Sequence, residues 1–477
     1  MRIPALKYVI GGLVGASVPA LLVTGSAFAE DADPVATLAQ STNLLWVVIG
    51  AMLVIFMQAG FALVETGFTQ KKNAAHVMST NFAIFGLGFV GFLFIGYPLA
   101  FGGLDTSIYF GDGGAAMGDA LVGSGNWTFL YWGYEHLGSA ATPALLGFFL
   151  YMVAFMDTVA TIPTGSMAER WKWNSFAIWG LFCGAIFYPL FAAWTWGGGW
   201  LGKTWDTMSL GAGYVDFAGS GVVHAVGGAA ALAGAIVLGP RIGKFAADGT
   251  PKAIPGHNIP MAMLGGLILL FGWFGFNAAS TFSSSDIQFA TVAANTAIAA
   301  AVGAVVGMIW IQLKTGKPDP GMMVNGMLAG LVAITAPCAF VSPWAAALIG
   351  LIAAILAIEA VYFIERRGVD DPVGAIAVHG VCGTFGVLAV GLFANGTYGG
   401  GWNGSSVTGV EGLFYGDASQ LGAQALGVVV IWTVIFGLAF AFFSIQNKVT
   451  KGGIRLPEDQ EISGADIPEM GVAGYND

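Results

Sequence analysis

The stretch DFAGSGVVHAVGGAA at residues 216–230 decides the fold, because its pattern returns as DPVGAIAVHGVCGTF at residues 371–385. In each stretch an aspartate stands eight residues before a histidine, and glycine-rich sequence follows. The histidines, His224 and His379, lie near the starts of two apolar segments that are five segments apart. An odd number of spans per half inverts the second half, so equivalent residues can meet near the midplane of a bilayer. The recurrence therefore predicts two inverted five-helix repeats.

The composition excludes a soluble protein. Only 9% of the 477 residues are charged and 56% are hydrophobic, whereas a soluble domain carries about 25% charged residues. The net charge of −10 would repel a phosphate backbone, so no nucleic-acid partner is expected. Three cysteines, far apart in apolar runs, form neither a disulfide framework nor a CxxC metal signature.

Apolar stretches long enough for membrane helices recur along the chain. A bilayer needs roughly 20 apolar residues per helix. We therefore predict an all-α integral membrane protein with eleven transmembrane helices, two five-helix inverted repeats plus a final helix. The predicted helices are 44–67, 79–102, 143–166, 175–196, 222–240, 260–280, 289–313, 321–338, 343–365, 374–394 and 420–446.

The N-terminus resembles a secretory signal. Arg2 and Lys7 precede an apolar run, and the small-residue triplet 27–29 stands before Glu30. We expect a cleavable signal peptide at 1–29, with an uncleaved first helix as the alternative. The chain then divides into a signal peptide at 1–29, a membrane domain at 30–446 and a cytoplasmic tail at 447–477.

The basic residues predict the orientation. Two of the 17 Lys and Arg lie in the signal, and 14 of the other 15 fall in segments that an outside N-terminus and an inside C-terminus make cytoplasmic. Only Lys203 lies in an outer loop. This distribution obeys the positive-inside rule. A signal peptide followed by many spans is typical of a multi-pass protein of a bacterial plasma membrane.

The two membrane histidines are the first functional candidates. An ionisable residue at membrane depth is a functional hypothesis by default, and two neighbouring imidazoles can share a proton. The alternatives are a buried histidine bonded to a helix carbonyl, or a haem or metal ligand. No further His, Cys or carboxylate cluster completes a metal set, so no metal or other cofactor is expected.

Two aspartates precede these histidines. Asp216 and Asp371 stand at helix starts, where a carboxylate satisfies free amides, so we interpret their first role as structural. Asp216 could also attract a cation at the outer mouth, but a direct ligand role is the weaker interpretation.

With these elements assembled, the sequence resembles the ammonium transporter family (Amt, Mep and Rh) along nearly all of its mature length. The resemblance rests on ordered motifs at matching spacing. They are QAGFA at 58–62 with KN at 72–73, GY at 96–97 with LAFG at 99–102, AER at 168–170, WGGG at 196–199, DFAG at 216–219 with VVH at 222–224, GWFGFN at 272–277, and DDP at 370–372 with VHG at 378–380.

The resemblance implies a homotrimer with one pore in each subunit. By motif position, Trp196 and Ser280 look like the outer ammonium recruitment site, together with Phe155 and Asp216. Phe155 and Phe276 look like a stacked aromatic gate below that site. His224 and His379 look like the lumenal pair, with Trp273 nearby.

The resemblance also implies a mechanism and a partner. Ammonium is recruited outside, loses a proton at or after the gate, and passes as ammonia along the histidine pair. The tail from Gly452 to Glu458 resembles a cytoplasmic tail that can meet a PII-type regulatory protein, but the match weakens beyond Gly464.

Two acidic residues depart from the family pattern. Asp157 follows Phe155 by two residues, about 200° around a helix, so it should face a neighbouring helix and find a buried partner. Glu65, near the inner end of the first helix, is expected to pair with Lys71 or Lys72.

The leading interpretation is a plasma-membrane ammonium transporter and not an enzyme. The alternatives are an ammonium sensor built on the same pore, an electroneutral Rh-like ammonia gas channel, and a redox membrane enzyme. The sequence leaves open whether transport moves charge, whether a PII protein acts on it, and what Asp157 and Glu65 do.

Overall fold

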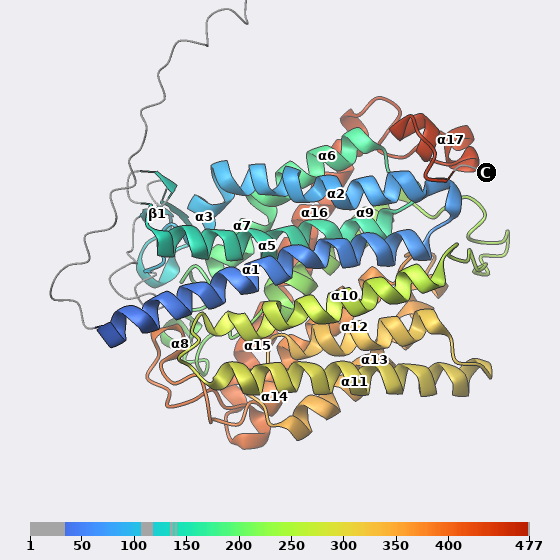
Figure 1. Ribbon diagram of the computed structural model, residues 1–477. Helices are drawn as coiled ribbons and strands as arrows, with labels where there is room; N and C mark the ends of the chain where they lie inside the picture. The colour runs from blue at the N-terminus through green and yellow to red at the C-terminus, as the bar shows by residue number, and fades with distance from the viewer. Residues whose placement is uncertain (1–33, 106–117, 134–136, 139–140, 476–477) are drawn as a thin grey trace, which may run out of the picture.

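A computed structural model describes residues 34–105, 118–133, 137–138 and 141–475. The predicted signal peptide, 1–29, lies outside these residues. The long helices run side by side in one bundle (Figure 1). The longer elements are α1 (Pro34–Phe68), α2 (Ala74–Gly91), α5 (Pro143–Met167), α6 (Trp173–Phe182), α9 (Val226–Leu238), α10 (Ile259–Ala278), α11 (Gln288–Thr315), α12 (Pro320–Ile334), α13 (Pro343–Arg366), α14 (Cys382–Phe393), α15 (Ala418–Val430) and α16 (Phe436–Val449).

Shorter elements extend or join these helices. The α-helical and β-strand segments are α3 (Tyr97–Phe101), α7 (Tyr188–Trp194), α8 (Thr204–Thr207), α17 (Glu458–Ser463), β1 (Asp119–Val122) and β2 (Leu130–Trp132). The π-helical turns are η2 (Phe92–Gly96), η6 (Cys183–Phe187), η7 (Ser220–Ala225), η9 (Ile376–Val381), η12 (Ile431–Ile435) and η13 (Asp466–Met470). The 3-10 turns are η1 (Lys71–Asn73), η4 (Gly125–Trp127), η8 (Ala279–Thr281), η10 (Trp402–Gly404) and η11 (Leu413–Tyr415).

Ten helical segments of the described chain are long and apolar enough to cross a membrane. They coincide with ten of the eleven predicted stretches. The eighth prediction, 321–338, corresponds to α12, which has only 15 residues and is about 22 Å long at 1.5 Å per residue. Pro337 disfavours helical backbone at the residue before it, so α12 ends early. Eleven complete spans are therefore not confirmed.

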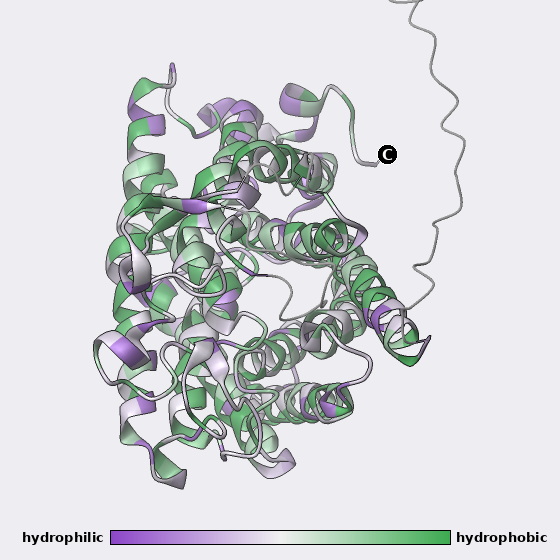
Figure 2. Ribbon diagram, turned by 90° about the vertical axis from the view of Figure 1, so that its left-hand side faces the viewer, coloured by the Kyte–Doolittle hydropathy of each residue, from purple (hydrophilic) through white to green (hydrophobic). Residues whose placement is uncertain are grey.

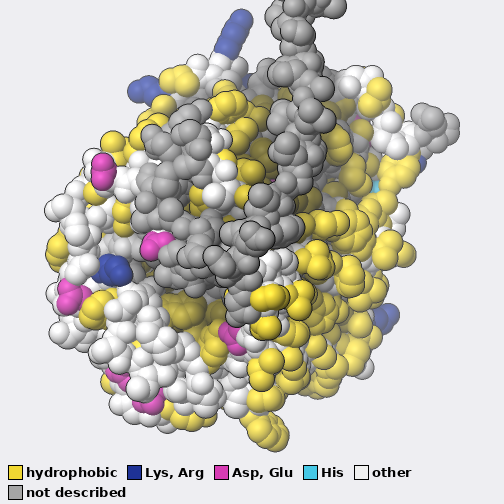
Figure 3. All heavy atoms as spheres, turned by 60° about the vertical axis from the view of Figure 1, so that its left-hand side comes forward, with side chains coloured by type: hydrophobic (Ala, Val, Ile, Leu, Met, Phe, Trp, Pro, Cys, Tyr) yellow, Lys and Arg dark blue, Asp and Glu magenta, His cyan; other side chains and the backbone are white. Residues whose placement is uncertain are grey.

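The flank of the bundle is apolar. Seen along the helices, hydrophobic residues fill the bundle, and hydrophilic ones concentrate at helix ends and loops (Figure 2). Figure 3 shows hydrophobic side chains covering the flank beside a loop-covered end where acidic side chains appear. Phe82 and Trp344 are each 85% exposed, which fits a surface that meets lipid rather than water.

The two ends of the bundle differ (Figure 1). One end, which we call the vestibule end, carries the antiparallel β1–β2 hairpin, which sequence analysis did not predict, together with α8 and the loop 395–417. The tail end carries residues 450–475. Basic residues divide accordingly, because Lys203 donates to the Asn403 carbonyl at the vestibule end, whereas Lys72 and Lys172 donate to tail carbonyls.

Glycines bring the two histidine segments together. Gly228 lies four residues after His224, and a Cβ there would fall 2.2 Å from the backbone nitrogen of Gly380. Gly383 lies four residues after His379, and its Cβ would fall 2.5 Å from the carbonyl oxygen of Ser220. Side chains at these positions would force the backbones apart. The α9 helix thus packs on η9, and α14 packs on η7.

Candidate pore and vestibule

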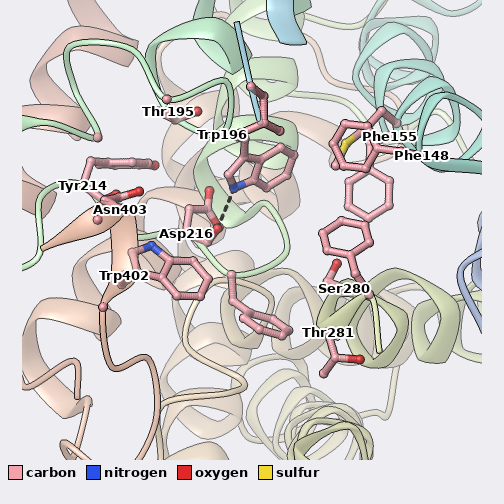
Figure 4. Close-up of a pocket in the computed structure, with 18 of the residues that line it drawn as sticks. Phe148, Phe155, Thr195, Trp196, Tyr214, Asp216, Ser280, Thr281, Trp402 and Asn403 are labelled. Atoms are coloured by element: carbon pink, nitrogen blue, oxygen red, sulfur yellow. Dashed lines mark hydrogen bonds between the residues drawn. The ribbon is translucent and has the colours of Figure 1, made fainter. Parts of the chain in front are cut away.

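A cavity of about 500 Å³ opens at the vestibule end. The four residues predicted for recruitment, Trp196, Ser280, Phe155 and Asp216, all line it. Figure 4 shows the Trp196 indole opposite the Trp402 indole, with Phe155 and Ser280 on another wall. The cavity therefore presents aromatic faces with a few polar atoms, which suits a small cation.

Hydrogen bonds hold the Trp196 and Ser280 side chains of the cavity wall in place. Trp196 donates through Nε1 to the backbone carbonyl of Asp216 at 2.7 Å (Figure 4). Ser280 donates to the Phe276 carbonyl at 2.8 Å, and its Oγ lies 3.1 Å from the Tyr151 hydroxyl. Tyr151 and Phe155 stand four residues apart on α5, so both reach the cavity from one helix face.

Two phenyl rings separate the cavity from the histidines. Phe155 and Phe276 are stacked, with ring centroids 4.1 Å apart and planes 22° apart. On the other side of the stack, Phe276 lies 5.4 Å from the His224 ring. The side chains of Phe155 and Phe276 are buried. A hydrated cation cannot pass this stack unless the rings move.

The histidines meet in the bundle interior. The Nδ1 atoms of His224 and His379 are 3.1 Å apart, and the ring centroids are 5.2 Å apart. One Nδ1 must therefore carry the hydrogen and the other accept it. Trp273 stacks on His224 at 5.1 Å and donates through Nε1 to the Thr335 hydroxyl. Nε2 of His224 has no hydrogen-bond partner among the described residues.

The aspartates of the repeat hold the two histidine turns. The Asp216 carboxylate accepts hydrogen bonds from the amides of Gly219, Gly221 and Val222, each at 2.8 Å. Burial raises the pKa of Asp216 to about 6, although these amides partly oppose the shift. The carboxylate thus caps η7, the π-helical turn that carries His224.

Asp371 repeats this arrangement in the second half. It accepts from the amides of Gly374, Ala375 and Ile376 at 3.1, 3.0 and 2.7 Å. Burial raises its pKa to about 6 as well, against the effect of these amides. Both aspartates therefore have the structural role that their positions indicate.

A second, small cavity of about 20 Å³ lies beyond the histidine pair. His379, Glu65, Phe61 and Asn325 are among its lining residues. The expected pairing of Glu65 with Lys71 or Lys72 is wrong. Glu65 accepts hydrogen bonds from Asn81 and Thr164 instead, and the Lys72 ammonium donates to tail carbonyls. The α1 helix turns Glu65 inward, toward α2 and α5.

Asp157 is buried, as expected, and does not line the vestibule cavity. Sequence analysis predicted a buried partner for Asp157. The Oδ1 atom of Asp157 has none, because it makes no hydrogen bond within the described residues. We find no structural reason for an acid at this position.

Sequence analysis missed several vestibule residues. Phe217, Tyr398, Trp402 and Asn403 line the cavity, three of them from the loop 395–417. The Asn403 amide donates to the carbonyls of Ala212 and Tyr214, which ties that loop to the first half. A loop without periodicity carries no signal for this contact. Tyr151 could have been found, because it precedes Phe155 by one helical turn.

The chain is similar to known proteins over nearly its full length. The family model described as Ammonium Transporter Family matches residues 45–475. Ammonium transporter Amt2 of Archaeoglobus fulgidus is 42% identical over 472 residues, covering 98% of this chain and 96% of that protein. The Ammonium transporter of Bacillus subtilis is 32% identical, covering 90% of this chain and 96% of that protein. The family match continues past Gly464, where sequence analysis expected it to weaken.

Solved structures share the fold. The structure named "Sensor Amt Protein" matches with a TM-score of 0.78 and 35% identity, over 91% of this chain and 99% of that one. Mep2 from Candida albicans matches with a TM-score of 0.71 and 28% identity, over 88% of this chain and 87% of that one.

Proposed function

This chain belongs to the ammonium transporter family, and on that premise we propose that it conducts ammonium across the plasma membrane through the sites described above. The observation that carries the proposal is their order. The aromatic vestibule, the stacked gate and the histidine pair follow one another, linked by ring contacts between Phe155, Phe276 and His224.

Recruitment takes place at the vestibule. Trp196, Phe155 and Ser280 together offer ring faces and a hydroxyl to a cation that is losing water. A cation–π contact contributes about 0.5 to 2 kcal/mol, which is too little to replace hydration. The Ser280 hydroxyl and nearby carbonyls must therefore supply the rest. Asp216 contributes indirectly, because its carbonyl orients the Trp196 indole.

Deprotonation follows at the gate. Ammonium gives a proton to the imidazole of His224 and continues as ammonia, which accepts and donates hydrogen bonds along His224 and His379. Potassium has no proton to give and no N–H to donate. It would have to lose its water inside an apolar passage, at a large cost in free energy.

Topology and assembly complete the proposal. The reciprocal packing of η7 on α14 and η9 on α9 supports two inverted repeats. The basic residues at the tail end support an outside N-terminus and a cytoplasmic tail. Family membership supports a homotrimer and a PII-type protein at the tail. Native mass spectrometry should give three copies per particle.

Electrical recording on a supported membrane tests the function. Ammonium should produce a current in wild type that potassium does not. His224→Ala and His379→Ala should each lower the ammonium current or admit potassium, because the proton-sharing pair is broken. If both variants match wild type in ammonium current and in potassium rejection, the lumenal pair is assigned wrongly.

A sensor built on the same pore is the second candidate, favoured by the similarity to the structure named "Sensor Amt Protein". Uptake of methylammonium into proteoliposomes separates the two. A transporter accumulates the tracer over time, whereas a sensor binds it without transport. Uptake without any ammonium current would instead indicate the electroneutral gas-channel variant.

A further inference from the structure

Glu65 is a carboxylic acid enclosed at the tail side of the histidine pair. Its side chain is buried, and it lines the same small cavity as His379. That cavity, at about 20 Å³, holds one molecule of the size of water or ammonia. A single occupant can therefore contact both residues.

Neutral donors hold this carboxyl group. Asn81 donates to Oε2 at 2.7 Å, and the Thr164 hydroxyl lies 2.8 and 2.9 Å from the two carboxyl oxygens. Behind them, Thr161 and Gln58 bond to Asn81, so the group is fixed from α1, α2 and α5. No basic side chain is recorded as a partner of Glu65 in the described part of the chain.

The titratable neighbours of Glu65 are few. Asp371 and His379 face it from the segment of η9. The helices α10 and α12, which complete the cavity wall, contain no titratable side chain. Removing water from a carboxyl at membrane depth is costly, and a glutamine could accept the same two hydrogen bonds. The hydrogen bonds that Glu65 accepts therefore do not by themselves require a carboxylic acid at this position.

We propose that Glu65 is the proton-transfer residue at the cytoplasmic end of the pore, returning a proton to ammonia as it leaves. This inference rests on the proposed function. The carboxyl O–H bond breaks and an N–H bond forms on the ammonia lone pair, leaving a carboxylate and an ammonium ion. The carboxylate then takes a proton from the His379 imidazolium, which received it through His224 from the incoming ammonium. Each cycle therefore moves one ammonia and one proton, and no proton is gained or lost.

The geometry favours this role over a purely structural one. A carboxylate held by donors keeps a defined position when it loses its proton, and the Asn81 and Thr164 donors stabilise that charged form. Ammonia leaving the histidine pair reaches the cavity before it reaches the tail end.

Charge recording on Glu65→Gln tests the proposal. Glutamine keeps the shape and an acceptor oxygen but cannot release a proton. The maximal ammonium current should fall at least tenfold, while the half-saturating ammonium concentration stays within twofold of wild type, since the vestibule is untouched. Glu65→Asp should restore part of the current. Asp157→Asn, a buried carboxyl that lines neither the vestibule nor the small cavity, is the matched control and should keep the wild-type current.

Infrared difference spectroscopy provides a second readout, which does not depend on the size of the current. Adding ammonium should change a carboxyl C=O band that persists in Asp157→Asn and shifts in Glu65→Asp. A Glu65→Gln current equal to that of wild type overturns the inference, and so does an unchanged carboxyl spectrum in a conducting protein. Absence of current and uptake in wild type overturns the proposed function itself, so the two failures are distinguishable.

Discussion

A single residue, Asp216, contacts both the vestibule wall and the turn that carries His224. Its carboxylate binds the amides that begin η7, and its carbonyl holds the Trp196 indole. The Trp196 indole and the turn that carries His224 are therefore positioned by one residue. The sequence indicated a helix cap and a possible attraction for a cation, but not the bond to Trp196, because that bond depends on how the loop 195–219 folds back.

The titration of Asp216 predicts a pH dependence of stability. Its pKa is about 6 in the folded protein because of burial, against about 3.9 in an unfolded chain. The folded state therefore binds more protons between these values, so this contribution to stability is fully present below pH 4 and is lost as pH rises through 6. The difference between these two pKa values corresponds to roughly 3 kcal/mol of stability.

Thermal unfolding in detergent checks this prediction. The stability of wild type relative to Asp216→Asn should fall by roughly 2 to 3 kcal/mol between pH 4 and pH 7, following the linkage above. Phe217→Leu, at the neighbouring position, should show no such pH-dependent difference. A wild-type advantage that stays constant with pH would contradict the assigned titration.

Among the elements, α9 and η9 are in backbone contact. A Cβ at Gly228 would lie 2.2 and 2.3 Å from the nitrogen and Cα of Gly380, closer than real atoms approach. The 3.1 Å separation of the two histidine Nδ1 atoms depends on this contact. Gly228 therefore has two roles, because it permits the packing of α9 on η9 and it sets the distance between the two histidines.

Gly228→Ala should therefore affect both stability and transport. Overpacking costs typically 1 to 3 kcal/mol, and a displacement of about 1 Å can lower a rate roughly 100-fold. We expect a lower melting temperature and an ammonium current reduced at least tenfold. Gly437→Ala, where a new Cβ meets no atom within 4 Å, is the control and should match wild type. Equal currents in the two variants would show that the contact can relax.

The Lys72 ammonium, which donates to the Glu461 and Ile462 carbonyls, and one buried acid both hold the tail element α17. Glu461 accepts hydrogen bonds from Arg455 at 2.9 and 3.0 Å and from the Ile242 amide at 2.8 Å. Because these bonds involve charge, each contributes about 1.5 to 3 kcal/mol. They attach the tail to the segment that follows α9.

Glu461→Ala should release this tail. Trypsin cleavage after Lys451 or Arg455 should be at least tenfold faster, because the loss of even one of these bonds costs more than 1.4 kcal/mol, which is a factor of about ten in the open population. Limited proteolysis followed by mass spectrometry measures the rate. Glu458→Ala removes an exposed acid from the same helix and should leave cleavage unchanged. An identical rate in both variants would mean that other contacts hold α17.

At the scale of the whole molecule, a buried ion cluster joins the two halves. Arg241, from the loop after α9, pairs with Glu169 of the first half and with Asp370 of the second. Burial disfavours the Asp370 charge, but hydrogen bonds from Arg241 and the charge of Arg170 outweigh it and lower the pKa of Asp370 to about 2. Asp370 therefore stays ionised at physiological pH.

Arg241→Ala should destabilise the folded protein by about 3 to 5 kcal/mol, because it leaves two buried carboxylates without their cation. The melting temperature in detergent measures this loss. Arg366→Ala, which removes an exposed arginine, should change it little. Comparable melting temperatures for the two variants would show that Glu169 and Asp370 find other partners.

The sequence by itself determined the class and the course of the chain. Apolar length located ten helices that are long enough to cross a membrane. The recurring aspartate and histidine located the two histidines that meet inside the bundle, because both signals can be read along the chain. The length of α12 was overestimated, since apolar composition does not reveal where Pro337 stops a helix.

The tertiary structure alone decided which side chains meet. Glu65 and the lysines at 71 and 72 are close in sequence, yet rotation of α1 directs Glu65 to Asn81 and Thr164. Two other contacts join positions that are far apart in the chain. His224 meets His379, and the loop 395–417 forms part of the vestibule wall. Such contacts depend on helix rotation and packing, which no local pattern encodes.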